Sequence, residues 1–397
     1  MAGGFVARLL RALRGGSDPA ADRVRTHLES TRDRLDVVRQ QRDDLQHRLD
    51  EAREQVARFR RKRRAAELLA ARWKTEKDYY RRRVLSTAVL KDLLPARREQ
   101  LHARASADGA EEREARLIAA SAAYREAVRS ADPGPLAART ELDGLAWWVP
   151  VGSDDADLVR RIVAKESLPY RALAHAREVC TGGIMLDLGA HDGSTAIPRV
   201  LLGEVEACYC AEPDPLNYAC LVANIVENGL RGFVLPDRVA IGARDGSAKL
   251  LRTKFSRGHR VLHDEDAGES EITEIKVRTL DTWLDELGVD PRAISFVKSD
   301  TQGYEMQVLL GASRLVSRAH VAWQLEFAPK LMRLAGSDPR EFLSLLQQRF
   351  THFIDLNPAA RGRRLRPVRD LTSVLDYVES QRLPHTDLIV YAGPRKS

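Results

Sequence analysis

Glycine and acidic residues gather where a short apolar run ends, in the segment from Asp187 to Gly193 (DLGAHDG). Residues 184–186 are apolar, and a helical pattern starts near Ser194, so the segment predicts a strand, a turn and a helix. Such a turn directs backbone N–H groups and a helix N-terminus toward a ligand. Glu212 ends the next predicted strand, where doubly wound nucleotide-binding folds hold a ribose diol.

The side chain in the middle of the turn indicates which nucleotide is bound. A dinucleotide site needs a central glycine in G-x-G-x-x-G so that the backbone approaches the pyrophosphate, and His191 stands there instead. A dehydrogenase is therefore disfavoured. S-adenosylmethionine has no pyrophosphate. Its sulfonium and amino-acid end need room and a hydrogen-bond acceptor, and Asp187 is close enough to help provide one. The alternative interpretation is an ordinary tight strand-to-helix connection.

A second acidic group lies in the segment Val297–Glu305 (VKSDTQGYE). Asp300 ends a predicted strand and Glu305 lies in the first turn of the next helix, at the edge of the sheet where ligands bind. The competing interpretation is structural, because Asp300 is also a suitable helix cap and Glu305 suits the helix dipole.

Six segments in this order resemble the FkbM family of S-adenosylmethionine-dependent methyltransferases, over about residues 180–395: LDLGAHDG at 186–193, AEPDP at 211–215, Asn224 with NGL at 228–230, VAIG at 239–242, RTLD at 278–281 and KSDTQGYE at 298–305. The resemblance implies a class I methyltransferase fold, S-adenosylmethionine as cofactor and O-methylation as the usual reaction. It also implies that Asp300 and Glu305 are the acidic pair near the active site, which makes both of them catalytic candidates. The expected cofactor site comprises Asp187, Gly189, His191, Gly193, Glu212 and Ala240.

A hydroxyl acceptor must lose a proton, which calls for a general base or a metal. Four residues are candidates for the base: His191, His259, Asp300 and Glu326. A metal held by Asp300, Glu305 and Glu326 is the less favoured alternative. Gln302 is neutral where the family frequently has an acid, so we expect no metal.

Short apolar runs alternate with helical patterns, as in a doubly wound, mostly parallel α/β sheet. The strands are expected at 184–188, 207–211, 238–241, 295–298, 321–326 and 388–391. The helices are expected at 194–202, 215–228, 280–287, 303–310 and 339–350. Two further runs, at 248–252 and 274–277, predict an antiparallel insertion.

A heptad seam over about residues 20–60 predicts a long helical coiled coil, which the family resemblance does not cover. We expect a flexible N-terminus at 1–19, the coiled coil at 20–100, a helical linker at 101–140 and the methyltransferase domain at 141–397. The coiled coil would form a homodimer or dock a partner. A long solvated helix is the alternative.

The sequence has 64 Lys and Arg against 57 Asp and Glu, and a net charge of +7. No nucleic-acid motif accompanies its arginine clusters, so no specific nucleic-acid partner is predicted. It has no apolar run long enough to span a membrane and no signal-peptide pattern, which predicts a cytoplasmic protein. The expected acceptor is a small molecule or glycan. Two alternatives remain, a coiled-coil adaptor with an inactive methyltransferase-like domain and a nucleic-acid methyltransferase.

Overall fold

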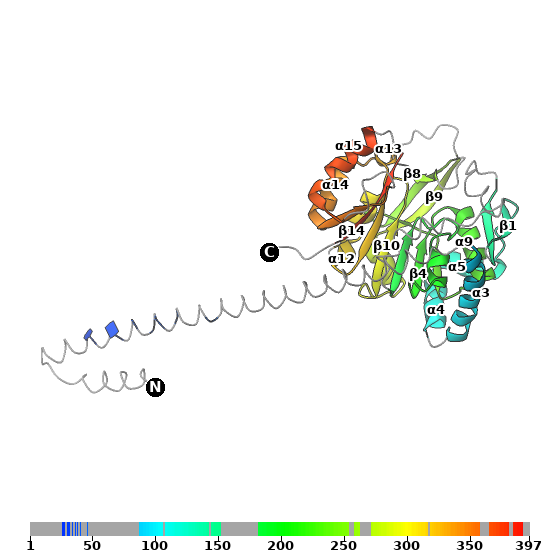
Figure 1. Ribbon diagram of the computed structural model, residues 1–397, viewed down its shortest axis with the longest axis horizontal. Helices are drawn as coiled ribbons and strands as arrows, with labels where there is room; N and C mark the ends of the chain where they lie inside the picture. The colour runs from blue at the N-terminus through cyan, green and yellow to red at the C-terminus, as the bar shows by residue number, and fades with distance from the viewer. Residues whose placement is uncertain are drawn as a thin grey trace, which may run out of the picture. The chain divides into compact units, whose positions relative to one another are not determined.

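The computed structural model describes residues 87–391 apart from 106–107, 143, 152–181, 254–257, 263–270, 317, 358–364 and 381–383, together with scattered helical positions between 26 and 46. Its described elements belong to a compact unit that spans residues 80–397 (Figure 1). Most of the predicted coiled coil at 20–100, and the N-terminus at 1–19, lie outside the described residues. Homodimerisation through that segment stays a prediction.

An eight-stranded sheet forms the centre of the unit, in the order β13-β12-β14-β11-β10-β3-β4-β5. The bounds of these strands are β3 Ile184–Leu188, β4 Ala207–Ala211, β5 Val234–Asp237, β10 Ile294–Ser299, β11 Ala322–Phe327, β12 His352–Asp355, β13 Arg366–Pro367 and β14 Thr386–Tyr391. The five neighbouring strands from β11 to β5 run parallel, whereas β14, β12 and β13 pair antiparallel. The predicted mostly parallel α/β sheet is confirmed.

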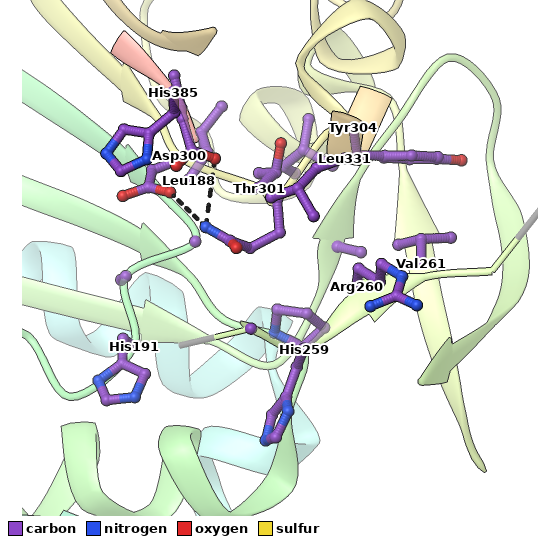
Figure 2. A pocket seen from close by; sticks show the side chains of 18 of the residues that line it. Leu188, His191, His259, Arg260, Val261, Asp300, Thr301, Tyr304, Leu331 and His385 are labelled. Atoms are coloured by element: carbon purple, nitrogen blue, oxygen red, sulfur yellow. Dashed lines mark hydrogen bonds between the residues drawn. The ribbon is translucent and has the colours of Figure 1, made fainter. Parts of the chain in front are cut away.

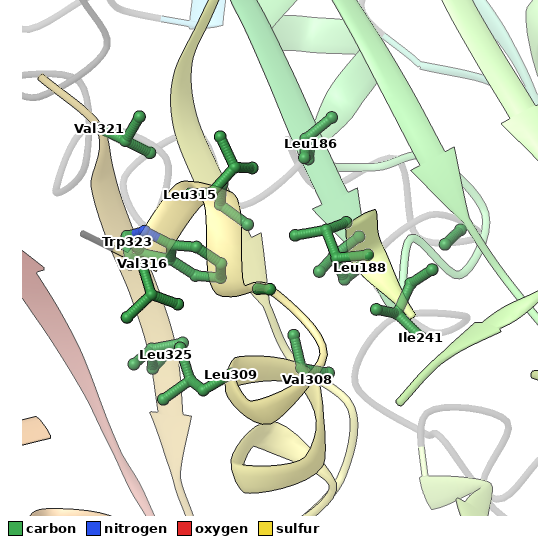
Figure 3. Packing of buried hydrophobic residues seen from close by; sticks show 14 of the residues in the cluster. Leu186, Leu188, Ile241, Val308, Leu309, Leu315, Val316, Val321, Trp323 and Leu325 are labelled. Carbon is green, nitrogen blue, oxygen red and sulfur yellow. The ribbon is translucent and has the colours of Figure 1, made fainter. Parts of the chain in front are cut away.

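The two faces of the sheet follow from alternation along each strand. On β3, Leu186 and Leu188 join the main hydrophobic core, while Asp187 between them points to the other face. Figure 3 shows the main core, where Leu186 and Leu188 pack near Val308 and Leu309 of α11 (Glu305–Leu310). This packing fixes the end of β3 against one face of the sheet, so the residues that follow it are held in place.

Helices cover both ends of the sheet (Figure 1). Besides α11, their bounds are α3 Thr87–Arg104, α4 Ala110–Ala120, α5 Ala122–Ser130, α8 Ala196–Leu201, α9 Pro215–Glu227, α10 Leu280–Glu286, α12 Ser313–Val316, α13 Pro329–Leu334, α14 Pro339–Arg349, the 3-10 helix η4 Val368–Asp370 and α15 Thr372–Ser380. Helices α4, α5 and α9 pack near β5. Helix α9 starts at Pro215, directly after Asp214. The carboxylate of Asp214 accepts hydrogen bonds from Leu216 N and Asn217 N, as expected of an N-cap.

Residues 101–140 were expected to be a helical linker, and they form part of the compact unit. Helices α4 and α5 contribute Leu117 and Tyr124 to the main core. A hairpin follows, made of β1 (Ala137–Leu142) and β2 (Leu145–Pro150), and it packs on α9. The apolar faces of these helices are thus buried against the main core.

A second, four-stranded sheet in the order β6-β9-β7-β8 is inserted after β5. Its strands are β6 Ala240–Ile241, β7 Gly246–Arg252, β8 Arg260–Val261 and β9 Glu271–Arg278. Strands β7 and β9 pair antiparallel from Gly246 opposite Val277 to Arg252 opposite Glu271, which confirms the predicted antiparallel insertion.

One predicted strand, at 238–241, is wrong. The strand of the main sheet is β5 at Val234–Asp237, and the two residues of β6 belong to the inserted sheet. Pro236 made the earlier segment a poor strand candidate, but β5 lies at the edge of the sheet, where a proline is tolerated. Among the described helices, none is both long and apolar enough to cross a membrane.

Candidate active site

A cavity of about 850 Å³ opens at the carboxyl ends of the central strands. Seven of the ten predicted site residues line it: Gly189, His191, Glu212, Ala240, His259, Asp300 and Glu326. The other three predicted residues, Asp187, Gly193 and Glu305, do not line the cavity and lie outside its wall. Figure 2 shows Asp300, Thr301 and His385 at one end of the cavity, with His191 and His259 toward the other.

The turn after β3 is built for close approach. Gly189 has φ +79°, and a Cβ there would lie 2.0 Å from the carbonyl oxygen of Asp300. Only glycine fits, because both the backbone conformation and the space exclude a side chain. His191 also adopts a positive φ, of 53°, which is uncommon for a residue with a side chain and frequent at functional sites.

Glu212 holds this turn from the end of β4. Its Oε2 accepts a hydrogen bond from His191 N at 2.8 Å, and its Oε1 accepts one from Asp214 N at 3.0 Å. Burial raises the pKa of Glu212 to about 7. Each carboxylate oxygen keeps a second lone pair, so the group still has capacity to accept hydrogen bonds from a diol in the cavity.

Lys298 lies between the two ends of the cavity. It stands opposite Asp187 in the parallel pairing of β10 and β3, and its Nζ donates to Asp187 Oδ1 at 3.1 Å. The same Nζ is 3.5 Å from Asp300 Oδ2 and 3.5 Å from Gly189 O. Burial opposes the charge on Lys298, but Asp187 and Asp300 outweigh it and raise the pKa of the ammonium. The group is therefore a cation shared by two carboxylates.

The side-chain amide of Gln302 forms hydrogen bonds to the carboxylates of both Asp300 and Glu326. Gln302 Nε2 donates to Asp300 Oδ1 at 3.0 Å and to Glu326 Oε2 at 3.2 Å (Figure 2). Gln302 reaches both from a positive φ of 57°. Burial, together with the charge of Asp300, raises the pKa of Glu326 well above its ordinary value. Asp387 stands opposite Glu326 on β14, and burial raises its pKa to about 6.

Glu305 was predicted as a catalytic candidate, and the structure places it behind the wall. Its Oε1 accepts hydrogen bonds from Thr301 N at 2.7 Å and from Thr301 Oγ1 at 2.9 Å, so it fixes the loop that carries Asp300. Burial raises the pKa of Glu305 to about 7. Within the described residues, no group of three or more His, Cys, Asp or Glu side chains is arranged to hold a metal ion, and Asp300, Glu305 and Glu326 form no such set.

The two remaining predicted residues have different surroundings. Gly193 has φ +83°, and a Cβ there would meet Leu221 at 2.7 Å, so it lets the turn pack on α9. His259 lies away from the end of the cavity that contains Asp300 and Glu326. Its Nδ1 accepts a hydrogen bond from Thr253 N at 3.1 Å, and its Nε2 lies 3.7 Å from Asp214 Oδ2.

Sequence reasoning missed Lys298, Gln302, His385 and Asp387 as parts of the site. Lys298 and Gln302 lie inside the segment that already contained Asp300, and their residue types gave a signal. His385 and Asp387 come from β14 and the residues before it, and nothing in the sequence pairs that strand with β11.

Residues 187–350 match the family model of the methyltransferase FkbM domain. The chain carries an FkbM methyltransferase domain. The methyl donor of this domain is S-adenosylmethionine. The match begins at Asp187 and contains the cofactor turn, Glu212, Lys298, Asp300 and Glu326, so the residues that line most of the cavity are those of the FkbM domain.

Comparison with solved structures returns methyltransferases of low similarity. They include Sp1610 of Streptococcus pneumoniae, a putative tRNA methyltransferase, with 14% identity over 57% of this chain and 71% of that chain and a TM-score of 0.32. TYW2 of P. horikoshii in complex with MeSAdo has 12% identity over 65% and 72%, with a TM-score of 0.31. A precorrin-6y C5,15-methyltransferase of Geobacter metallireducens has 13% identity over 61% and 98%, with a TM-score of 0.31. A search of curated proteins found no match. The assignment therefore rests on the family match.

Proposed function

We propose that the protein transfers the methyl group of S-adenosylmethionine to a hydroxyl oxygen of a sugar, glycan or other small molecule. One observation carries the proposal. A single cavity joins the turn at Gly189 and Glu212 to a hydrogen-bonding group of Asp300, Gln302 and Glu326. A methyl donor bound at the first end and an acceptor bound at the second would meet beside Lys298.

The residues of the first end fit the cofactor. Glu212 is buried at the tip of β4, where a carboxylate accepts hydrogen bonds from both ribose hydroxyls. Lys298 is paired with both Asp187 and Asp300, so the three groups together carry one negative charge when all are ionised. Such a charge favours a bound sulfonium, which supplies the methyl group.

The residues of the second end fit a hydroxyl acceptor. Methyl transfer is a direct displacement, so the protein mainly aligns the acceptor oxygen with the methyl carbon. The acceptor also loses its proton, and Asp300 is the proposed base because it lines the cavity with 41% of its side chain exposed. Lys298 and Gln302 hold the carboxylate in place through its two oxygens.

The chemistry of this wall supports a polyhydroxylated acceptor. Asp300, Gln302, Glu326 and His385 all line the cavity and offer both donors and acceptors of hydrogen bonds. A sugar presents several hydroxyls that each donate and accept, so it satisfies such a wall better than an apolar molecule would.

Isothermal titration with S-adenosylmethionine, followed by a transfer assay, tests the proposal. The assay measures S-adenosylhomocysteine release with a panel of monosaccharides and nucleotide sugars. With an acceptor in hand, Asp300→Asn is expected to lower kcat by about 10²–10⁴-fold, the usual contribution of a general base, with little change in the affinity for S-adenosylhomocysteine, which carries no sulfonium. Asp376→Asn, at an exposed position on α15, is the matched control and should keep full activity.

One result would reject the proposal, and a second would reject the assignment of Asp300 as the base. Absence of cofactor binding at millimolar concentration would favour the alternative, an adaptor protein with an inactive methyltransferase-like domain. Full activity of the Asp300→Asn variant would show that another group takes the proton.

A further inference from the structure

We propose that His259 is a cofactor-binding residue that covers the adenine end of S-adenosylmethionine, and that the inserted sheet is part of the cofactor site. This inference rests on the proposed function. It assigns to His259 a role different from that of a general base for the acceptor.

The order of the strands fixes where the adenine lies. Strands β3, β4 and β5 are neighbours in the sheet, so Gly189, Glu212 and Val239 follow consecutive strand ends. A cofactor with its amino-acid end at Gly189 and its ribose at Glu212 has its base over the residues after β5. The cavity wall there is apolar and suits the faces of a purine. It includes Pro213, Val239 and, from the inserted sheet, Ile241 and Leu250.

His259 lies at this end of the cavity. Its side chain is only 9% exposed, and its Nε2 is 3.7 Å from the carboxylate of Asp214, two residues after Glu212. Thr253 N donates to its Nδ1 at 3.1 Å, which places the ring proton on Nε2 in the neutral tautomer. The imidazole therefore presents a donor edge beside the Glu212–Asp214 turn. Figure 2 shows it well separated from Asp300 and His385.

An ion pair ties the insert to the cofactor side. Arg252, the last residue of β7, donates from Nε to Asp214 Oδ2 at 2.7 Å, and Asp214 is fully buried. The other oxygen of Asp214 caps α9 through Leu216 N and Asn217 N, each at 2.9 Å. One carboxylate thus anchors both the helix that follows Glu212 and the strand that precedes His259. This ion pair holds the insert against the adenosine end of the cavity.

Calorimetric titration of the full chain with two ligands tests the inference without knowledge of the acceptor. S-adenosylhomocysteine contains the whole cofactor except the methyl group, and 5′-methylthioadenosine lacks the amino-acid end. His259→Ala is expected to weaken both ligands by the same factor, about tenfold. His352→Ala, at an exposed histidine on β12 that does not line the cavity, is the matched control and should leave both affinities unchanged.

A second variant separates binding from folding. Arg252→Gln keeps His259 but removes the ion pair with Asp214, and it should weaken both ligands several-fold. Melting temperatures of the ligand-free variants report any loss of fold. Unchanged affinity in His259→Ala would overturn the inference while leaving the proposed function intact, as would a loss confined to S-adenosylhomocysteine. A wild-type chain that binds neither ligand would overturn the proposed function and this inference together.

Discussion

At the scale of single residues, Glu212 links the shape of the cofactor turn to its proposed task. The carboxylate accepts from the backbone of His191 and Asp214, and the proposed ribose contact adds two hydroxyl donors to the same group. Hydroxyl donors favour the ionised carboxylate, whereas burial raises the pKa of Glu212 to about 7. We therefore expect cofactor binding to be linked to loss of a proton from Glu212.

We expect S-adenosylhomocysteine to bind about tenfold more weakly at pH 6 than at pH 8, because a carboxyl with a pKa of about 7 is mostly protonated at pH 6. Calorimetric titration at the two pH values measures the ratio. Glu212→Gln cannot titrate and should bind with nearly equal affinity at both. His191 faces Glu212, so His191→Asn serves as a second control that should retain the tenfold ratio. A pH-independent wild-type affinity would contradict the role of Glu212.

The residue types of the site were predictable from the sequence, but their partners were not. Acidic residues at strand ends identified Glu212, Asp300 and Glu326 as lining residues. The contact of Lys298 with Asp187 depends on the register between β10 and β3, which no local pattern encodes. Glu305 shows the opposite case. Its structural interpretation, as an acid in the first turn of a helix, fits the structure, because its carboxylate accepts a hydrogen bond from Thr301 N.

At the scale of elements, two asparagines attach the β1–β2 hairpin to the cofactor half of the domain. Asn224 lies in the last turn of α9 and Asn228 is its C-cap, and each side chain both donates to and accepts from the backbone of one residue of β2. Asn224 pairs with Trp148 at 2.5 and 3.0 Å, and Asn228 pairs with Ala146 at 3.0 and 2.8 Å. Only Asn224 also donates to Asp192 O, at 2.8 Å, within the cofactor turn.

This difference predicts different effects of two similar variants. Asn224→Ala and Asn228→Ala should each cost about 1–3 kcal/mol of stability, because each leaves buried backbone groups of the hairpin unpaired. Asn224→Ala should in addition weaken S-adenosylhomocysteine binding, since the turn at Asp192 loses a donor. Thermal unfolding and calorimetric titration of the two variants measure both effects. Equal ligand affinity in the two variants would disprove the link between the hairpin and the turn.

Elements were predictable where their own residues determine them. The expected strands at 184–188 and 207–211 are β3 and β4 with the same bounds, because both are short, central and, apart from Asp187, apolar. Strand β12 was not expected, since only four residues form it and its stability comes from pairing with β14, remote in sequence. The same remote pairing brings Asp387 opposite Glu326. Elements that depend on distant partners are the ones that sequence patterns miss.

At the scale of the whole molecule, the buried carboxyls give the fold and the cofactor opposite pH preferences. Burial raises the pKa of Glu212 and Glu305 to about 7, that of Asp387 to about 6, and that of Glu326 well above its ordinary value. Between their unfolded pKa values, near 4, and these folded values, the native chain binds more protons than the unfolded chain. The stability that these groups contribute is therefore present at low pH and is lost as the pH rises through about 6–7.

We therefore expect the melting temperature of the ligand-free protein to fall between pH 5 and pH 7.5. This pH range lies above the range in which exposed carboxyls such as Asp245 and Asp290 titrate. Hydrogen bonds to nearby residues lower the pKa values of these two groups. Each buried group changes the free energy of unfolding by at most about 1.4 kcal/mol per pH unit.

Glu305→Gln, which keeps the shape of a side chain outside the cavity wall, should make the fall in melting temperature shallower. Saturating S-adenosylhomocysteine should oppose it, because the ligand binds the ionised form of Glu212. Scanning calorimetry with and without ligand measures both slopes, and a ligand-free melting temperature that rises with pH in this window would contradict the assignment of these carboxyls as protonated in the native state.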